Sequence, residues 1–135
     1  MDDRTNLPDP ATVTGIQDLF AQYAHRIDGR DFDGFGELFT AGADYSLAGN
    51  ASQGRDAIVA FMRSVMTSPG GAHIITNVSV RTGADGARAA IADYLLTRRP
   101  EAGAPFAVIG VGKYDATVVH DEGTWRFAAL TITPQ

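Results

Sequence analysis

Cysteine is absent from this chain of 135 residues, and basic side chains are scarce. The absence of cysteine excludes a disulfide framework and a thiol nucleophile. The 11 Lys and Arg residues are outnumbered by 16 Asp and Glu, so the formal net charge is −5 and the pI is near 4.9. Because proteins bind nucleic acids mainly through clustered Lys and Arg, this balance argues against a nucleic-acid partner.

Long apolar runs and metal-binding motifs are also missing. No apolar run is long enough to span a bilayer, and no charged-then-apolar signal segment stands at the N-terminus, so we expect a cytoplasmic protein without a membrane partner. The three histidines are scattered, without a His-x-His or His-Glu-x-x-His pattern, which predicts no metal site. Phosphate loops and the Gly-x-Ser-x-Gly elbow of serine hydrolases are missing too.

What remains is a composition typical of one folded unit. Hydrophobic residues make up 44% of the chain, enough to build a core. We expect residues 1–8 to form a flexible polar arm and residues 9–135 to form a single domain. The first half of that domain reads as helical. A long helix follows the start signal at Asp9-Pro10 and ends near Gly29, and a short second helix follows from Asp31. A short strand at 43–47 precedes a third helix that begins at Gly54.

The second half reads as four strands, at about 73–82, 87–99, 106–119 and 124–133. The short turns at 83–86 and 121–123 favour antiparallel hairpins. Helices followed by a meander of long strands predict an α+β fold, with a curved antiparallel sheet wrapped around the long N-terminal helix. Two further helices would close one end of a cone, and the interior of a cone is a common location for a small-molecule pocket.

An aspartate in the second long strand is the most informative single residue. Strict alternation puts Asp93 on one face with Ile91 and Leu95, on an apolar surface where a carboxylate needs a partner, a proton or a pocket. The alternative is a buried structural ion pair, for example with Arg126.

Three other side chains are candidates for proton chemistry, each with a plain structural alternative. Tyr23 lies on the apolar face of the first helix, as a hydrogen-bond donor or an ordinary core tyrosine. Asp28 ends that helix, where the pattern alone predicts a solvated acid. His73 opens the first long strand on the same face as Ile75 and Asn77, and alternation leaves its direction open.

A family resemblance is carried by six segments. They are IQDLFAQYAHRID (16–28), FGELFT (35–40), GRDAI (54–58), HIITN (73–77), GKY (112–114) and WRF (125–127). In this order they resemble the SnoaL-like branch of the nuclear-transport-factor-2-like superfamily, over about residues 12–133. That branch is similar to scytalone dehydratase, bile-acid dehydratase and the small polyketide cyclases. The resemblance implies a cystatin-like cone.

The resemblance also implies a site. It turns His73 toward the pocket and assigns catalytic roles to Tyr23, Asp28, His73 and Asp93. We expect the substrate to be bound by Phe20, Tyr45, Met62 and Asn77. The chain departs from the family in two places. Asp93 and Tyr94 stand where scytalone dehydratase has a second strand histidine, and no second basic residue follows the 125–127 segment. The second departure favours a neutral, mostly apolar substrate.

We therefore expect a cofactor-free lyase or isomerase of the dehydratase type, acting on a small cyclic or polyketide-like carbonyl compound. In this prediction Asp28 lies within hydrogen-bond reach of His73 and orients it, and His73 removes a proton next to the carbonyl. Tyr23 stabilises the enolate, and a protonated Asp93 donates a proton. Two alternatives stay open. One is an epoxide hydrolase with a water held by Asp93, and the other is a non-catalytic module for small-ligand binding or dimerisation.

A homodimer packed sheet to sheet is the expected assembly. Strict alternation puts Trp125, Phe127, Ala129 and Thr131 on the outer side of the sheet, where an apolar face is usually covered by a partner. The alternative is that Trp125 packs inside its own chain.

Overall fold

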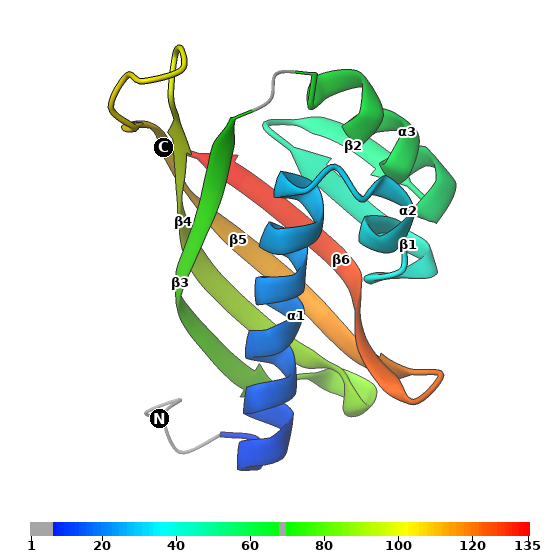
Figure 1. The fold of residues 1–135 in the computed structure, drawn as a ribbon. Helices are drawn as coiled ribbons and strands as arrows, with labels where there is room; N and C mark the ends of the chain where they lie inside the picture. Colours follow the sequence, from blue (N-terminus) through cyan, green and yellow to red (C-terminus); the bar gives the residue numbers. More distant parts are fainter. Residues whose placement is uncertain (1–6, 68–69) are drawn as a thin grey trace.

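The structure, a computed structural model, describes residues 7–67 and 70–135 (Figure 1). Most of the predicted arm, residues 1–6, therefore lies outside the described residues. The helices are α1 (Pro10–Asp28), α2 (Phe32–Gly36) and α3 (Arg55–Val65), with a 3₁₀ turn at Ala84–Gly86. The strands are β1 (Phe39–Leu47), β2 (Asn50–Gln53), β3 (Gly71–Thr82), β4 (Arg88–Arg98), β5 (Ala107–Asp121) and β6 (Thr124–Pro134). No helix within the described ranges is long and apolar enough to cross a membrane.

The strands form one sheet in the order β2-β1-β6-β5-β4-β3. The meander of β3 to β6 is antiparallel throughout, as the short turns predict. The sheet is nevertheless mixed, because β1 pairs with β6 in parallel. No hairpin joins these two strands, so no tight turn forces them to run in opposite directions.

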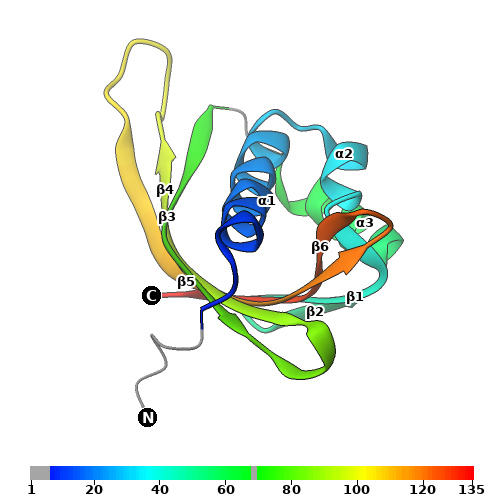
Figure 2. The same cartoon turned by 90° about the horizontal axis from the view of Figure 1, so that it is seen from below.

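The sheet curves without closing, and α1 lies against its concave side, while α2 and α3 cover the β1–β2 end (Figures 1 and 2). The α+β cone that the sequence predicts is confirmed. Register shifts interrupt the pairing of β3, β4 and β6 with their neighbours, and such bulges increase the local bend of a strand. Position 112 requires glycine, because a Cβ there would overlap the ring of Tyr94.

Helix α1 is the axis around which the site is built. Asp9 caps its first turn, because the side chain accepts hydrogen bonds from the backbone N–H and the hydroxyl of Thr12, both at 3.0 Å. The helix ends where the N–H of Gly29 donates to the carbonyl of His25. Its buried face contributes Ile16, Leu19, Phe20, Tyr23, Ala24 and Ile27 to a core rich in aromatic rings.

The inner face of β6 differs from the one that strict alternation predicts. Phe127 is fully buried in the core, so its predicted place on the outer side is wrong. Trp125 packs on the inner side against Gly15, where a Cβ would come within 2.8 Å of the indole Cδ1. A register shift between Phe127 and Ala129 then moves the alternation by one residue, and Thr131 is exposed. The alternative, in which Trp125 packs within its own chain, is confirmed.

Candidate active site

The end of α1 and the beginning of β3 bring together Asp28 and His73, which are 45 residues apart. Oδ1 of Asp28 lies 2.6 Å from Nδ1 of His73, and Oδ2 accepts the backbone N–H of His73 at 2.9 Å. Only 22% of the Asp28 side chain and 11% of the His73 side chain are exposed. The predicted contact between the two residues is confirmed, and two bonds to one carboxylate fix the imidazole ring in place.

This pairing determines which ring nitrogen of His73 is available. A carboxylate accepts hydrogen bonds, so the nitrogen that faces Asp28, Nδ1, carries the proton when His73 is neutral. Nε2 then holds the lone pair, and no residue in the described part of the chain forms a hydrogen bond with it. His73 is thus arranged to accept a proton at Nε2.

The position of Asp28 is one that helix electrostatics alone would disfavour. It is the last residue of α1, where the helix dipole is negative and the backbone of the helix offers a carboxylate no stabilisation. The two hydrogen bonds from His73 offset this cost. The interpretation of Asp28 as a solvated loop acid is therefore wrong.

A cluster of tyrosine hydroxyls lies next to this pair. Oη of Tyr23 is 2.9 Å from Oη of Tyr45, whose hydroxyl also donates to Sδ of Met62 at 3.5 Å. The ring of Tyr23 lies edge-on to the imidazole of His73, with centroids 6.4 Å apart. Tyr114 completes the cluster, because its ring lies 5.4 Å from that of Tyr23 and its hydroxyl interacts with the Tyr23 hydroxyl.

Burial keeps these hydroxyls protonated. Desolvation raises the pKa of Tyr23 well above its ordinary value, and the neighbouring Tyr45 and Tyr114 raise it further. Desolvation likewise raises the pKa values of Tyr45 and Tyr114. At neutral pH all three side chains therefore remain neutral O–H groups.

Sequence reasoning did not single out Tyr114. The signal was present, because alternation along β5 puts Gly112, Tyr114, Ala116 and Val118 on one face, and the structure buries that face. A tyrosine in such a row needs a partner for its hydroxyl, which is the argument that singled out Tyr23. The same argument applies to Tyr94 on β4, whose ring stacks at 4.9 Å from Tyr114.

Phe20 and Met62, predicted to contact the substrate, are both buried in the core beside this cluster. Phe20 packs against the rings of Tyr114 and Phe127, at 5.9 and 5.2 Å. It also lines a groove of about 260 Å³ between α1 and β3, together with His73 and His25. The groove thus opens beside His73 on the surface of the described residues.

Asp93 lies elsewhere, and its predicted placement in the pocket is wrong. The inner face of β4 is formed by Ala90, Ala92 and Tyr94, which leaves Asp93 on the outer face. There it accepts hydrogen bonds from Nζ of Lys113 at 2.6 Å and from Nδ2 of Asn77 at 2.8 Å. Both faces of this strand carry small apolar residues, so alternation alone could not choose between them.

The electrostatics of Asp93 also differ from the prediction. The hydrogen bond from Lys113, followed by the one from Asn77, holds the pKa of Asp93 below its ordinary value of 3.8. The carboxyl is therefore ionised at neutral pH, where a protonated one was expected. Arg126 is not its partner either, because the Arg126 Nε donates to the carbonyl of Glu37 at 2.9 Å.

Asn77 is the second predicted site residue that lies outside the cone. Its backbone has a positive φ of 55°, and the pairing of β3 with β4 shifts at this point. The bulge moves the alternation by one residue, so His73 and Ile75 lie inward before it and Val80 lies inward after it. Asn77 is exposed on the outer face, and its predicted contact with a substrate in the interior is not possible in this arrangement.

No ligand set for a metal is present in the residues that the structure covers. There, no group of three or more His, Cys, Asp or Glu side chains is close enough to hold an ion.

The chain matches a family model described as a SnoaL-like domain over residues 11–131. No curated protein matches it significantly. Among solved structures, Aln2 from a Streptomyces species is 27% identical with a TM-score of 0.85, covering 93% of this chain and 92% of Aln2. An NTF2-like protein with a cystatin-like fold from Novosphingobium aromaticivorans is 25% identical, with a TM-score of 0.76 and coverages of 98% and 90%. ActVI-ORFA from Streptomyces coelicolor is 16% identical, with a TM-score of 0.81 and coverages of 93% and 98%, which shows a shared fold.

Proposed function

This chain belongs to the SnoaL-like domain family, and on that premise we propose that it is a cofactor-free lyase or isomerase of the dehydratase type. The wider superfamily includes dehydratases and polyketide cyclases. Its substrate in this proposal is a small, mostly apolar cyclic or polyketide-like compound with a carbonyl group. The observation that carries the proposal is the hydrogen bond between Asp28 and His73, which leaves Nε2 of His73 as a free base.

The first step is the removal of a proton from the carbon next to the carbonyl. Nε2 of His73 takes this proton, and the electron pair of the C–H bond moves to the carbonyl oxygen to form an enolate. The imidazolium produced is stabilised by the carboxylate of Asp28 at 2.6 Å. This is the usual work of a carboxylate–histidine pair, because the carboxylate orients the ring and offsets its new charge.

The tyrosine cluster supports the same step. The enolate oxygen needs neutral donors, and Tyr23, Tyr45 and Tyr114 remain protonated because burial raises their pKa values. Removal of one such donor commonly costs about 10²–10³ in rate.

The proton then returns to the substrate. In an isomerisation, the imidazolium of His73 delivers it to another carbon. In a dehydration, the enolate expels a hydroxyl from the β-carbon, and the same imidazolium protonates that hydroxyl as it leaves as water. We assign no step to Asp93, because the carboxylate is ionised and lies on the outer face.

Of the rival functions, the epoxide hydrolase loses its main support. It relied on a water held by Asp93, and that carboxylate is engaged by Lys113 and Asn77 outside the cone. A non-catalytic binding module would bind the same ligands without converting them. Only a measurement of the reaction itself can therefore separate it from the proposal.

The experiment follows proton abstraction directly. Small cyclic ketones and β-hydroxyketones are incubated with the protein in heavy water, and loss of the α-hydrogen signal is measured by NMR. Exchange that the wild type catalyses and His73→Ala does not supports the proposal. His120→Ala is the matched control, since His120 is exposed beside a turn and packs on Trp125, away from the pair. Bound ketones that exchange no faster than in buffer would favour the binding module.

We also propose that the chain forms a homodimer through the outer face of its sheet. The outer face of β3, β4 and β5 exposes Ile74, Ile91, Ile109 and Val111, each 44% exposed or more. Ile74, Leu95 and Val111 pair across the three strands and form a continuous apolar row. A second copy suits this surface, because the Lys113–Asp93 pair offers both signs of charge to its own symmetry mate. These residues replace Trp125 and Phe127 as the expected contacts.

A further inference from the structure

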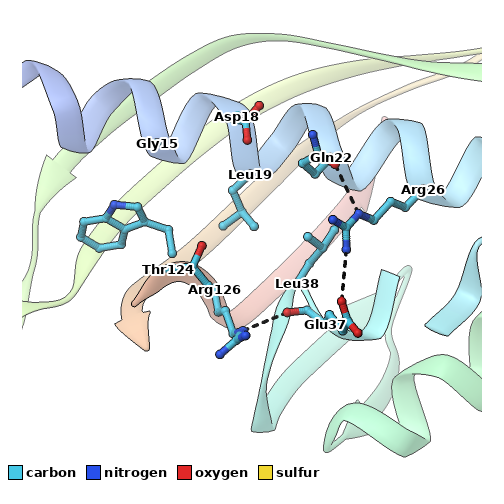
Figure 3. Close-up of a pocket in the computed structure, with 10 residues that line it drawn as sticks. Gly15, Asp18, Leu19, Gln22, Arg26, Glu37, Leu38, Thr124 and Arg126 are labelled. Carbon is cyan, nitrogen blue, oxygen red and sulfur yellow. Dashed lines mark hydrogen bonds and ion pairs between the residues drawn. The ribbon is translucent and has the colours of Figure 1, made fainter. Parts of the chain in front are cut away.

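A second hollow lies on another side of α1, away from Asp28 and His73. It has a volume of about 410 Å³ and runs between one stripe of α1, the two residues just before β1 and the start of β6 (Figure 3). Gly15, Leu19, Gln22 and Arg26 follow one another on that stripe at helical spacing. Neither Asp28 nor His73 lines this hollow, which we call the α1–β6 groove.

Two arginines of the α1–β6 groove each contact the same residue, Glu37. Nε of Arg126 donates to the Glu37 carbonyl at 2.9 Å, and Nη1 of Arg26 lies 3.7 Å from the Glu37 carboxylate (Figure 3). Arg26 is held further by Gln22, which accepts from its Nε at 3.3 Å, and by the Gly34 carbonyl, which accepts from its Nη1 at 2.6 Å. The two guanidinium groups are therefore positioned before any ligand arrives.

Each of these guanidinium groups has an unused side. The described contacts of Arg26 and Arg126 all involve Nε and Nη1, so both Nη2 groups lack a hydrogen-bond partner within the described ranges. The Arg126 side chain is only 15% exposed, and its Nη1 faces two acids, Glu122 at 3.2 Å and Asp121 at 3.5 Å. The Glu37 side chain beside Arg26 is 70% exposed, and its carboxylate lies 3.7 Å from Arg26. Such a long, solvated ion pair contributes little to stability, so a better acceptor can easily replace Glu37 at Arg26.

The floor of the α1–β6 groove is apolar. Leu19 and Leu38 are buried there, and the indole of Trp125 stands at one end against Gly15. An anion alone would leave this surface unused. A ligand that has a carboxylate at one end and an apolar body at the other would use both features, because arginine side chains pair with planar carboxylates and apolar surface gains from burial.

We propose that the α1–β6 groove binds a small organic carboxylate with an apolar body. The carboxylate accepts hydrogen bonds from the Nη2 groups of Arg26 and Arg126 and displaces the side chain of Glu37 from Arg26. The apolar body covers Leu19 and Leu38 and reaches toward Trp125. This site is separate from the proposed catalytic pair and does not depend on its function.

The single tryptophan of the chain makes a direct test possible. Benzoate is titrated into ¹⁵N-labelled protein, and the one indole N–H resonance, that of Trp125, is followed by NMR. Benzamide, which has the same ring and no charge, is the matched ligand control. We expect a saturable shift of the indole resonance with benzoate and a much weaker response with benzamide.

Variants place the binding in the groove. Arg26→Gln removes one donor pair and is expected to weaken benzoate binding by about tenfold or more. Arg63→Gln is the matched control, because Arg63 on α3 pairs with Asp33 on α2 and lies outside the groove. Asp18→Asn removes a like charge at the rim of the groove and is expected to tighten binding by about two- to fivefold. A melting curve for each variant checks that it is folded.

Three results would overturn the proposal. The first is an indole resonance that does not move in a saturable way with benzoate. The second is benzamide binding as tightly as benzoate, and the third is equal affinity of folded Arg26→Gln and wild type. Benzoate binding that is lost in His73→Ala and kept in Arg26→Gln would assign the ligand to the catalytic pair instead.

Discussion

Two aspartates of this protein, Asp28 and Asp93, each contact a nitrogen-bearing side chain at 2.6 Å, yet they lie in opposite settings. Asp28 pairs with His73 in a largely buried setting next to a cluster of neutral hydroxyls. Asp93 pairs with Lys113 on the outer face of the sheet, where 63% of the lysine side chain is exposed. A histidine can gain and lose a proton near neutral pH, whereas a lysine at the surface stays charged.

The partner and the side of the sheet therefore determine what a carboxylate can do. In the proposed function the Asp28–His73 pair moves a proton, whereas the Asp93–Lys113 pair is an ion pair at the surface. Substitutions in the two pairs and on the outer face should accordingly differ widely in their effects.

Loss of His73 is expected to have the largest effect. His73→Ala removes the base, so the exchange of α-hydrogens on a ketone substrate should fall by about 10²–10⁴-fold. Ligand affinity, measured by calorimetry, should change little, because the surrounding aromatic surface remains. If the folded variant exchanges as fast as wild type, the base has been misassigned.

Loss of the Asp28 carboxylate should have the next largest effect. Asp28→Asn keeps the shape but removes the charge and one of the two oxygens that accept from the backbone N–H and Nδ1 of His73, so turnover should fall by about 10²-fold or more. The ¹⁵N shifts of the imidazole report the tautomer directly. Wild-type turnover together with an unchanged tautomer would show that Asp28 only shapes the helix end.

A charge on the outer face should act on assembly and spare the chemistry. Val111→Asp places an acid in the apolar row, where two copies would bring two such acids together. We expect light scattering to report a dimer for wild type and a monomer for the variant, with exchange per chain nearly unchanged. Thr117→Asp, on the same face of β5 and away from that row, is the control. A wild-type chain that is monomeric at micromolar concentration refutes the dimer.

Asp93→Asn should have the smallest effect. It should leave turnover per folded molecule unchanged, because Asp93 lies outside the cone and contacts no residue of the proposed mechanism. Its effect should be a small loss of stability that depends on pH. The folded-state pKa of Asp93 lies below its ordinary value of 3.8, so the unfolded chain binds the proton first as the solution is acidified.

The stabilisation by Asp93 is therefore complete above that ordinary value and is lost as pH falls through the folded-state pKa. Melting temperatures of wild type and Asp93→Asn should differ slightly at neutral pH and converge in strong acid. If the difference between the two melting temperatures instead widens on acidification, the carboxyl of Asp93 is protonated in the folded protein, as the sequence analysis predicts.

Much of the fold could be predicted because its signals are local. The cap at Asp9, the helical spacing up to Ile27 and the short turns between strands each depend on a few neighbouring residues. The parallel pairing of β1 with β6 could not be predicted this way, because no turn between those strands encodes their relative direction.

The candidate site shows the same division. The nature of Tyr23, Asp28 and His73 as proton-handling groups follows from residue type, and the family resemblance indicated that they meet. The failures, Asn77, Asp93 and Phe127, all lie on strands. At Asn77 a bulge breaks the period of two residues, whereas at Asp93 and Phe127 the period holds and only the choice of the inward face is wrong.

Residue patterns and the family resemblance were enough to predict the helices, the four long strands, the α+β class and the family to which the chain belongs. Which faces turn inward depends on how the strands pair in the folded protein. A bulge such as the one at Asn77 inserts one residue because of how neighbouring strands pair, and it reverses the faces of everything after it. The 2.6 Å contact between Asp28 and His73 likewise depends on tertiary structure, because the two residues are 45 positions apart and only the complete fold brings them together.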